Sequence, residues 1–176
     1  MSEKHSIVIE EYLMLLYQLR GAGERLACDI AFRHNLAEYF LCNTLGIPWY
    51  EVHKHAHQLE HAMTPTVVDK LAAFLNYPET CPHGTPMPGH SLPEDSSTLD
   101  QAEEGMMVEI MMIAEELEDS EELLKILHTQ QLIPGQKHQV ISRADVMSSM
   151  TLQQEEQKAI LPFHVADKIH VVHVED

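Results

Sequence analysis

The segment PWYEVHKHAHQLEHAM, residues 48–63, carries four of the chain's 13 histidines within nine residues. It contains no glycine, and its only proline stands first, so it predicts a helix over Pro48–Met63 with the proline in the first turn. Steps of three and four place four ligand-type side chains on one face of that helix: His53, His57, Glu60 and His61. His55 is out of phase with this face, and we expect it at the surface.

A second helix, predicted over Glu24–Leu45 (ERLACDIAFRHNLAEYFLCNTL), repeats this chemistry with His34 and Glu38 four residues apart. Imidazole nitrogen and carboxylate oxygen are ligands that divalent first-row metals prefer. Two neighbouring antiparallel helices can direct such side chains at shared ions. A solvated polar face would explain a single pair, but six ligand-type residues in phase on two helices favour a metal site. Because imidazoles must be neutral to bind metal, protons should compete below about pH 6.5.

Two further helices flank this pair. Ser6–Arg20 has apolar residues at helical spacing and is followed by Gly21-Ala22-Gly23, which ends it. Thr64-Pro65 begins another helix that runs to about Asn76, with an apolar side that we expect to be a dimer surface. The next stretch, Tyr77–Asp95, is interrupted by prolines and glycines and predicts an extended connector.

The charge and the residue pattern change beyond this connector. Residues 1–89 carry 6 basic and 10 acidic groups, whereas residues 90–176 carry 5 and 18. Four short runs are typical of strands: Met106–Ile113, His138–Ser142, Met150–Leu152 and Ile169–Val174. One helix, Ser120–Gln131, lies between them and opens with a suitable capping serine. Short strands with one helix predict a small β-barrel or sandwich.

The composition excludes several classes of protein. A chain of 176 residues with 44% apolar and 22% charged residues is globular. Its net charge of −17 repels phosphate backbones and so disfavours nonspecific binding along nucleic acid. Three scattered cysteines do not form a disulfide framework. We find no signal peptide in Met1–Leu19 and no apolar run long enough to insert in a membrane, so we expect a cytoplasmic protein. His138 has no phased partner, and we expect it at the surface.

Three spaced motifs resemble the DtxR/MntR family of metal-dependent repressors. They are His34-Asn-Leu-Ala-Glu38, the Val52–His61 segment, and Cys81-Pro-His-Gly-Thr-Pro-Met-Pro88. The resemblance implies an α+β protein: an N-terminal all-α metal-binding and dimerisation domain, then a small SH3-like (FeoA-type) β-barrel. It places a first helix, a remnant of a DNA-binding domain, at residues 1–20, the helical domain at 21–89, a linker at 90–100, and the FeoA/SH3-like domain at 101–176.

The resemblance also implies ligands. An ancillary site would use His34, Glu38 and His53, and a primary regulatory site would use Glu11, His57, Glu60 and His61. Asp119 and Glu122 are candidates for additional ancillary ligands from the FeoA-like domain. The family has Cys or Glu at the position of His57, and Met or Asp at that of Glu11. Nitrogen and oxygen ligands favour Fe2+ or Mn2+, with Zn2+, Co2+ and Ni2+ as alternatives.

The leading functional hypothesis is a metal-responsive, homodimeric regulator of transcription. In the family a winged helix-turn-helix follows the first helix, but here only Arg20–Glu24 separate that helix from the metal-binding helix. We therefore expect no direct DNA reading, and an output through protein partners such as a heterodimer with a full-length repressor. Alternatives are a metal-buffering or delivery protein that acts on a ferrous iron transport system, and a DNA-binding repressor as in the family. A metallohydrolase is disfavoured because no His-Glu-x-x-His motif occurs, so we expect no enzyme.

Overall fold

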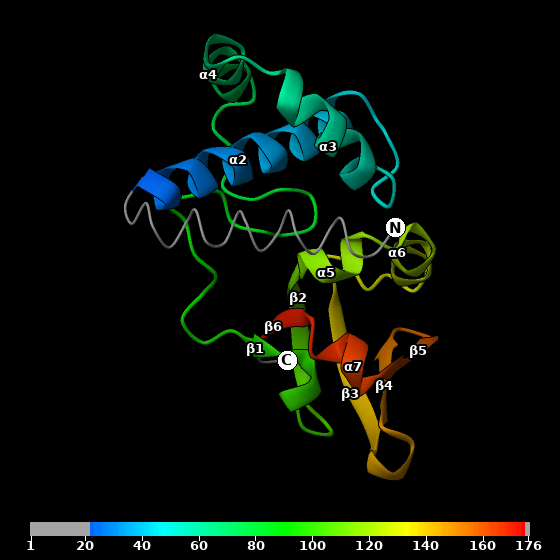
Figure 1. Ribbon diagram of the computed structural model, residues 1–176. Coiled ribbons are helices and arrows are strands. Elements are labelled where there is room, and N and C mark those ends of the chain that lie inside the picture. The colour runs from blue at the N-terminus through cyan, green and yellow to red at the C-terminus, as the bar shows by residue number, and fades with distance from the viewer. Residues whose placement is uncertain (1–21, 175–176) are drawn as a thin grey trace, which may run out of the picture.

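The computed structural model describes residues 22–174, which form a helical layer above a sheet (Figure 1). The helical layer consists of α2 (Ala22–Tyr39), the π-helical turn η1 (Phe40–Thr44), α3 (Val52–Ala62) and α4 (Pro65–Phe74). α2 and η1 together correspond to the predicted second helix. α4 begins with Pro65 in its first turn, as predicted. α3 begins later than predicted, because Pro48 starts a separate turn in which Glu51 N donates to Pro48 O (2.8 Å).

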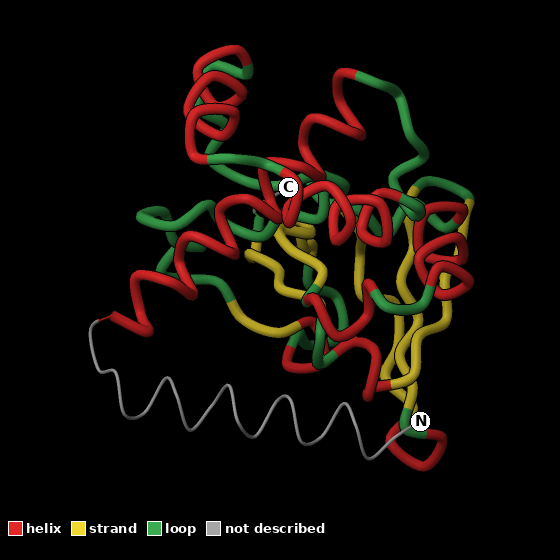
Figure 2. The backbone as a smooth tube through the Cα atoms, turned by 45° about the horizontal axis from the view of Figure 1, so that its top comes forward, coloured by secondary structure: helices red, strands yellow, loops and turns green. Residues whose placement is uncertain are grey.

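The second half forms a six-stranded antiparallel sheet with the order β1-β6-β2-β3-β4-β5. Figure 2 draws the strands of this sheet in yellow. Its strands are β1 (Ser97–Thr98), β2 (Met107–Ile113), β3 (Lys137–Ala144), β4 (Ser149–Gln154), β5 (Gln157–Pro162) and β6 (Ile169–His173). Between them lie η2 (Leu99–Gln101), α5 (Glu115–Glu118), α6 (Glu121–Thr129), η3 (Asp145–Met147) and α7 (Phe163–Ala166). The predicted α+β class is confirmed. β1 lies in the segment expected as a linker and pairs with β6.

Two separate apolar cores hold the two layers. One lies among the helices and includes Leu36, Val52 and Val68; the other lies within the sheet and under α6. Trp49 and Tyr50, from the turn before α3, pack against the core of the sheet. The helical layer is therefore anchored to the sheet by aromatic side chains. Within residues 22–174, no helix combines the length and apolar character needed to cross a membrane.

The connector between the layers forms a small hairpin-like loop. Cys81 N donates to Thr85 O (2.9 Å), and Met87 N donates to Glu79 O (2.8 Å). At its tip, His83 O accepts from Ile113 N of β2 (2.8 Å). Gly84 has φ +89°, and a Cβ there would lie 1.9 Å from Met111 O. Only glycine fits at this contact, so the loop is fixed against the end of β2.

His138 is buried rather than at the surface as expected. Its side chain lies on β3 with 1% of its area exposed, and Nε2–H donates to Gln131 O (2.9 Å). Its Nδ1 atom is buried without a partner among the described residues. Burial lowers the pKa of His138, so the ring is neutral in the core of the sheet.

We predict that Gly84→Ala detaches the loop from β2 and destabilises the protein. Gly89→Ala is the matched control, because Gly89 also has a positive φ, of +95°, but no atom lies within 4 Å of its added Cβ. Gly89→Ala should therefore lower the free energy of unfolding by the backbone strain alone, at least about 1 kcal/mol. Gly84→Ala should lower it clearly more, because it adds the clash with Met111. Urea unfolding measures both, and equal losses would contradict the close contact.

Candidate metal centre

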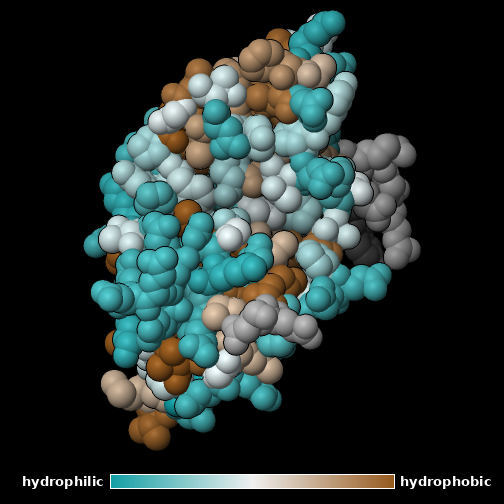
Figure 3. Space-filling view, turned by 180° about the vertical axis from the view of Figure 1, so that it is seen from behind, coloured by the Kyte–Doolittle hydropathy of each residue, from teal (hydrophilic) through white to brown (hydrophobic). Residues whose placement is uncertain are grey.

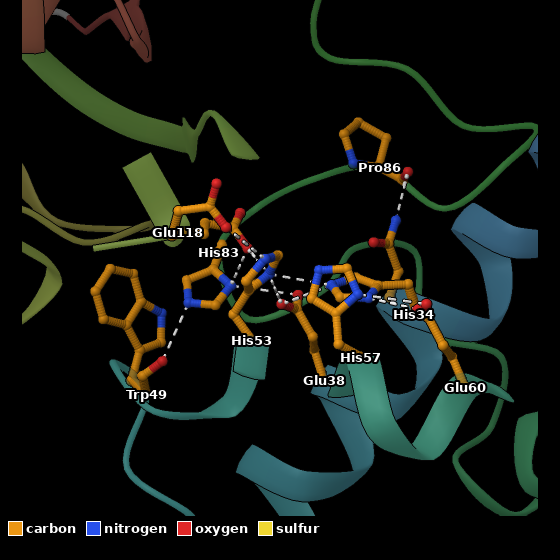
Figure 4. A network of polar contacts seen from close by, with 11 residues as sticks. His34, Glu38, Trp49, His53, His57, Glu60, His83, Pro86 and Glu118 are labelled. Atoms are coloured by element: carbon orange, nitrogen blue, oxygen red, sulfur yellow. Dashed lines mark hydrogen bonds and ion pairs between the residues drawn. The ribbon is translucent and has the colours of Figure 1, made fainter. Parts of the chain in front are cut away.

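Five buried side chains meet between the helices and the sheet, and we call them the inner cluster. α2 contributes His34 and Glu38, α3 contributes His53, the connector loop contributes His83, and α5 contributes Glu118 (Figure 4). Each has at most 7% of its area exposed. The four-residue spacing on α2 directs His34 and Glu38 to the same side, and α3 packs across that side.

Glu38 lies at the centre of the inner cluster with 1% of its area exposed. Its Oε1 lies 3.2 Å from His34 Nε2 and 3.1 Å from His53 Nδ1, and its Oε2 lies 3.2 Å from His83 Nδ1. Burying an unpaired carboxylate is costly, so three imidazoles around one carboxylate are the compensation expected in a protein interior.

Glu118 closes the inner cluster from the side of the sheet. Its Oε2 lies 2.9 Å from His53 Nδ1 and 3.2 Å from His83 Nδ1. The Nε2–H of His83 donates to the backbone carbonyl of Trp49 (3.1 Å), which fixes the ring with Nδ1 toward the two carboxylates. The buried Cys81 lies beside His83 and Glu38, with ligand atoms of the three within 4.8 Å of one another.

A second group, which we call the outer cluster, lies at the surface end of the same face and consists of His57, Glu60 and His61. Glu60 is buried, and its Oε1 lies 3.4 Å from both His57 Nδ1 and His61 Nε2. Its other oxygen, Oε2, lies 2.7 Å from His34 Nδ1. His34 therefore contacts both clusters, with one ring nitrogen toward each.

The structure brings together six of the nine predicted site residues in these two clusters: His34, Glu38, His53, His57, Glu60 and His61. Glu11 lies outside the described residues. Asp119 is 85% exposed, with Oδ1 3.7 Å from His53 Nε2, and Glu122 lies on the outward side of α6. Glu118 occupies the position in the inner cluster for which Asp119 and Glu122 were candidates. Sequence reasoning missed Glu118 and assigned no role to His83 or Cys81, although the motif that contains them was recognised.

Hydrogen-bonded neighbours raise the pKa values of the inner histidines. Burial alone would lower the pKa of His53, but hydrogen bonds to Glu118 and Glu38 outweigh it and raise the pKa to about 10. Burial opposes the same effect at the other two histidines. The pKa of His34 is raised by Glu38 and Glu60, and that of His83 by hydrogen bonds with Cys81, Glu118 and Glu38. Burial would raise the pKa of Glu38, yet its three imidazole partners hold it well below its usual range. Without metal, these shifts favour imidazolium–carboxylate pairs in the inner cluster.

The donor set fits a divalent transition metal. One ligand atom from each of His34, Glu38, His53 and Glu118 lies within 4.8 Å of the others, and the same holds for His34, His57 and Glu60. Nitrogen and oxygen donors converging from separate elements are typical of sites for manganese, iron or zinc. Cys81 adds a thiol, but burial raises its pKa to about 11, so it is protonated in the metal-free protein.

Comparison with known proteins agrees with this geometry. Residues 21–89 match the family model described as "Iron dependent repressor, metal binding and dimerisation domain". The iron-dependent repressor IdeR of Mycobacterium tuberculosis is 42% identical over 72 residues, which are 41% of this chain and 31% of IdeR. The match therefore spans about a third of that relative.

Two solved structures share the fold over most of the chain. A manganese-dependent transcriptional repressor in complex with manganese is 26% identical, with a TM-score of 0.82, over 96% of this chain and 84% of the other. ScaR with bound Cd2+ is 30% identical, with a TM-score of 0.74, over 88% of this chain and 74% of the other.

We predict that metal binding to the inner cluster releases more than one proton per ion at pH 7. The raised pKa values mean that imidazolium groups must lose protons before they can bind metal. Affinity should therefore keep rising above pH 7, beyond the range expected from unperturbed histidine. Calorimetry of Mn2+ binding in buffers of different ionisation enthalpy measures the release, and affinity that is constant between pH 7 and 9 would contradict it.

The same raised pKa values make the metal-free fold less stable as the pH rises. A histidine whose folded pKa is raised stabilises the fold fully below its unfolded pKa, about 6.5. That contribution is lost as the pH rises through the folded value, about 10 for His53. Metal should therefore stabilise the protein most at the alkaline end of this range, where the protons no longer do.

Proposed function

The chain belongs to the DtxR/MntR family of metal-dependent transcriptional repressors, and on that premise we propose that residues 22–174 sense a divalent transition metal. The observation that carries the proposal is the inner cluster, in which two carboxylates and three imidazoles from four separate segments are buried together. The named relatives depend on iron or manganese. We accordingly assign Fe2+ or Mn2+ as the ligand of this chain.

The two clusters would have different roles. The inner cluster joins α2, α3, the connector loop and α5, so an ion there would hold the helical layer to the sheet. The outer cluster lies at the surface and opens toward the exposed side of α2, where Leu26 and Ile30 line a pocket with Glu60 and His61. We propose Glu11 as a further outer ligand, through which occupancy would control the position of the predicted helix at Ser6–Arg20.

We propose the domain division stated above, with residues 1–20, 21–89, 90–100 and 101–176 as its parts. Two separate apolar cores support it. We also propose that the metal signal passes to protein partners, such as a full-length repressor in a mixed dimer. The excess of acidic over basic groups in residues 90–176 supports this, since it disfavours contact with phosphates. A metal-dependent mobility shift of operator DNA by this chain would overturn it.

We predict two bound ions, of which single substitutions remove one each. His57→Ala should remove the outer ion and Glu38→Gln the inner one, because each deletes a central contact of its cluster. His55→Ala is the control, since His55 belongs to neither cluster. Anaerobic calorimetry with Fe2+ and Mn2+ gives the stoichiometry. Metal sensing is refuted if no ion binds more tightly than about 100 μM, roughly −5.5 kcal/mol. The assignment of His57, and not His55, to the metal-binding face of α3 is refuted if His55→Ala loses an ion that His57→Ala keeps.

We propose a homodimer formed through α4 and the turn after it. Val67, Phe74 and Tyr77 are 48%, 70% and 68% exposed there, and apolar side chains gather at this end of the molecule in Figure 3. Large apolar groups left at a surface are typical of interaction sites.

We predict that Phe74→Glu weakens the dimer at least tenfold, because it buries a charge in the interface. Ile160→Glu is the matched control: Ile160 is 67% exposed on β5, remote from α4 in sequence and fold. Sedimentation equilibrium measures both variants. A dimer weakened by Ile160→Glu and unaffected by Phe74→Glu would place the interface on the sheet instead.

A further inference from the structure

Arg33 of α2 holds a backbone carbonyl at the end of α3. Its Nη1–H donates to Met63 O (2.8 Å) across 30 positions of the sequence. Met63 is buried, and with φ −78° and ψ 118° it leads the chain out of the helix in an extended conformation. Only Met63 and Thr64 separate α3 from α4, so this hydrogen bond fixes both the end of α3 and the point at which α4 begins.

Asp29, one turn earlier on α2, directs the guanidinium of Arg33 toward this carbonyl. Its Oδ2 lies 2.8 Å from Arg33 Nη2, and the spacing of four places both side chains on one face of α2. A guanidinium carries its donors in a rigid fork, so a single side chain can hold the carboxylate and the carbonyl together. The side chain of Arg33 is 22% exposed, and its Nε is buried without a hydrogen-bond partner among residues 22–174. Arg33 is therefore fixed between two helices and does not extend freely into water.

The end of α3 that Arg33 holds carries part of the outer cluster. Glu60 and His61 lie in the last turn of α3, and they line one pocket together with Arg33. The last carbonyls of a helix have no partner within that helix, so this turn depends on contacts from outside. Arg33 supplies such a contact from α2, the helix that also carries His34. The contact therefore helps to set the separation of Glu60 from His34, whose facing atoms lie 2.7 Å apart.

The charge of Arg33 is kept off the ligand carboxylate itself. In the part of the chain that the structure describes, Arg33 forms its ion pair with Asp29 and none with Glu60. Both oxygens of Glu60 face imidazoles instead. A guanidinium bound directly to Glu60 would compete with a metal ion for the carboxylate. Arg33 thus stabilises the outer cluster through the backbone without occupying a ligand.

We propose that Arg33 is a positioning residue of the outer metal site. It acts through Met63 O, which keeps the last turn of α3 at the distance from α2 at which Glu60 and His61 share an ion with His57. The inference rests on the proposed function, because it presumes that the outer cluster binds an ion. Groups that orient metal ligands typically change metal affinity by about 10–100-fold when they are removed.

The test measures the affinities of both ions by calorimetry with Mn2+ on the full chain. Arg33→Met removes both contacts of the guanidinium, and Arg33→Lys retains the charge without the fork that holds two partners. Arg143→Met and Arg143→Lys are the matched controls. Arg143 also donates to backbone carbonyls of a distant segment, those of Asp100 and Ala102, but it lies on β3 in the sheet. The outer ion is identified as the one that His57→Ala loses.

We expect Arg33→Met to weaken the outer ion at least about tenfold and Arg33→Lys at least about threefold, with the inner ion within about twofold of the wild type. Both Arg143 variants should leave the two ions within about twofold of the wild type, although urea unfolding shows a loss of stability. If Arg33→Met does not fold, Arg33→Lys measured against Arg143→Lys decides the outcome.

An outer ion that the Arg33 variants bind as tightly as the wild type would overturn the positioning role and leave the proposed function standing. Equal weakening of both ions by an Arg33 variant would also overturn it, because a general loss of stability would then explain the effect. The same holds if the Arg143 variants weaken the outer ion as much. A wild type that binds no outer ion would refute the proposed two-ion function, and this inference with it.

Discussion

The rest of the structure depends on the burial of Glu38. A carboxylate with 1% of its area exposed must find compensating partners, and here it has three imidazoles within 3.2 Å. Those imidazoles come from α2, α3 and the connector loop, so the three segments have to meet at one point. Glu118 adds α5 to the same point through His53 and His83. The polar centre thus determines how the helical layer sits on the sheet.

Protons and a divalent ion are alternative ways to balance this centre. Without metal, the two carboxylates of the inner cluster are matched by imidazolium groups, whose pKa values are raised by that pairing. With metal, the imidazoles become neutral ligands, and the ion's charge of two balances the two carboxylates. The cluster can exchange protons for metal with little change in buried charge. His34 extends this exchange to the outer cluster, because its second nitrogen holds Glu60 at 2.7 Å.

Helical spacing predicted the part of the site that lies on regular helices. His34, Glu38, His53, His57, Glu60 and His61 repeat at steps of three and four, and a helix converts such steps directly into shared faces. Glu118 carried no such signal, because its direction is set by the short helix α5 at the end of β2 and not by the periodicity of a longer element. His83 lies at the tip of a loop, where its place depends on a hydrogen bond to Ile113 and on the close approach of Gly84. Contacts between segments distant in sequence decide both positions.

The same reasoning explains the errors in the fold. β5 was not predicted because its sequence shows no alternation of apolar and polar residues. In the sheet its residues do alternate, but the outward-pointing residue between buried Ala159 and Leu161 is the apolar Ile160. His138 was expected at the surface because it lies between polar residues and has no other histidine or carboxylate at a regular spacing. On β3, however, it lies two residues before the buried Val140, so both side chains point to the buried face of the strand.

The central claim is that the inner cluster binds metal between the helices and the sheet. Anomalous diffraction at the manganese edge, from crystals of the Mn2+-loaded protein, tests it most directly. We predict a peak about 2.0–2.3 Å from carboxylate oxygens of both Glu38 and Glu118, since these are ordinary bond lengths for such ions. Peaks confined to exposed histidines, with Glu38 still surrounded only by imidazoles, would contradict the account.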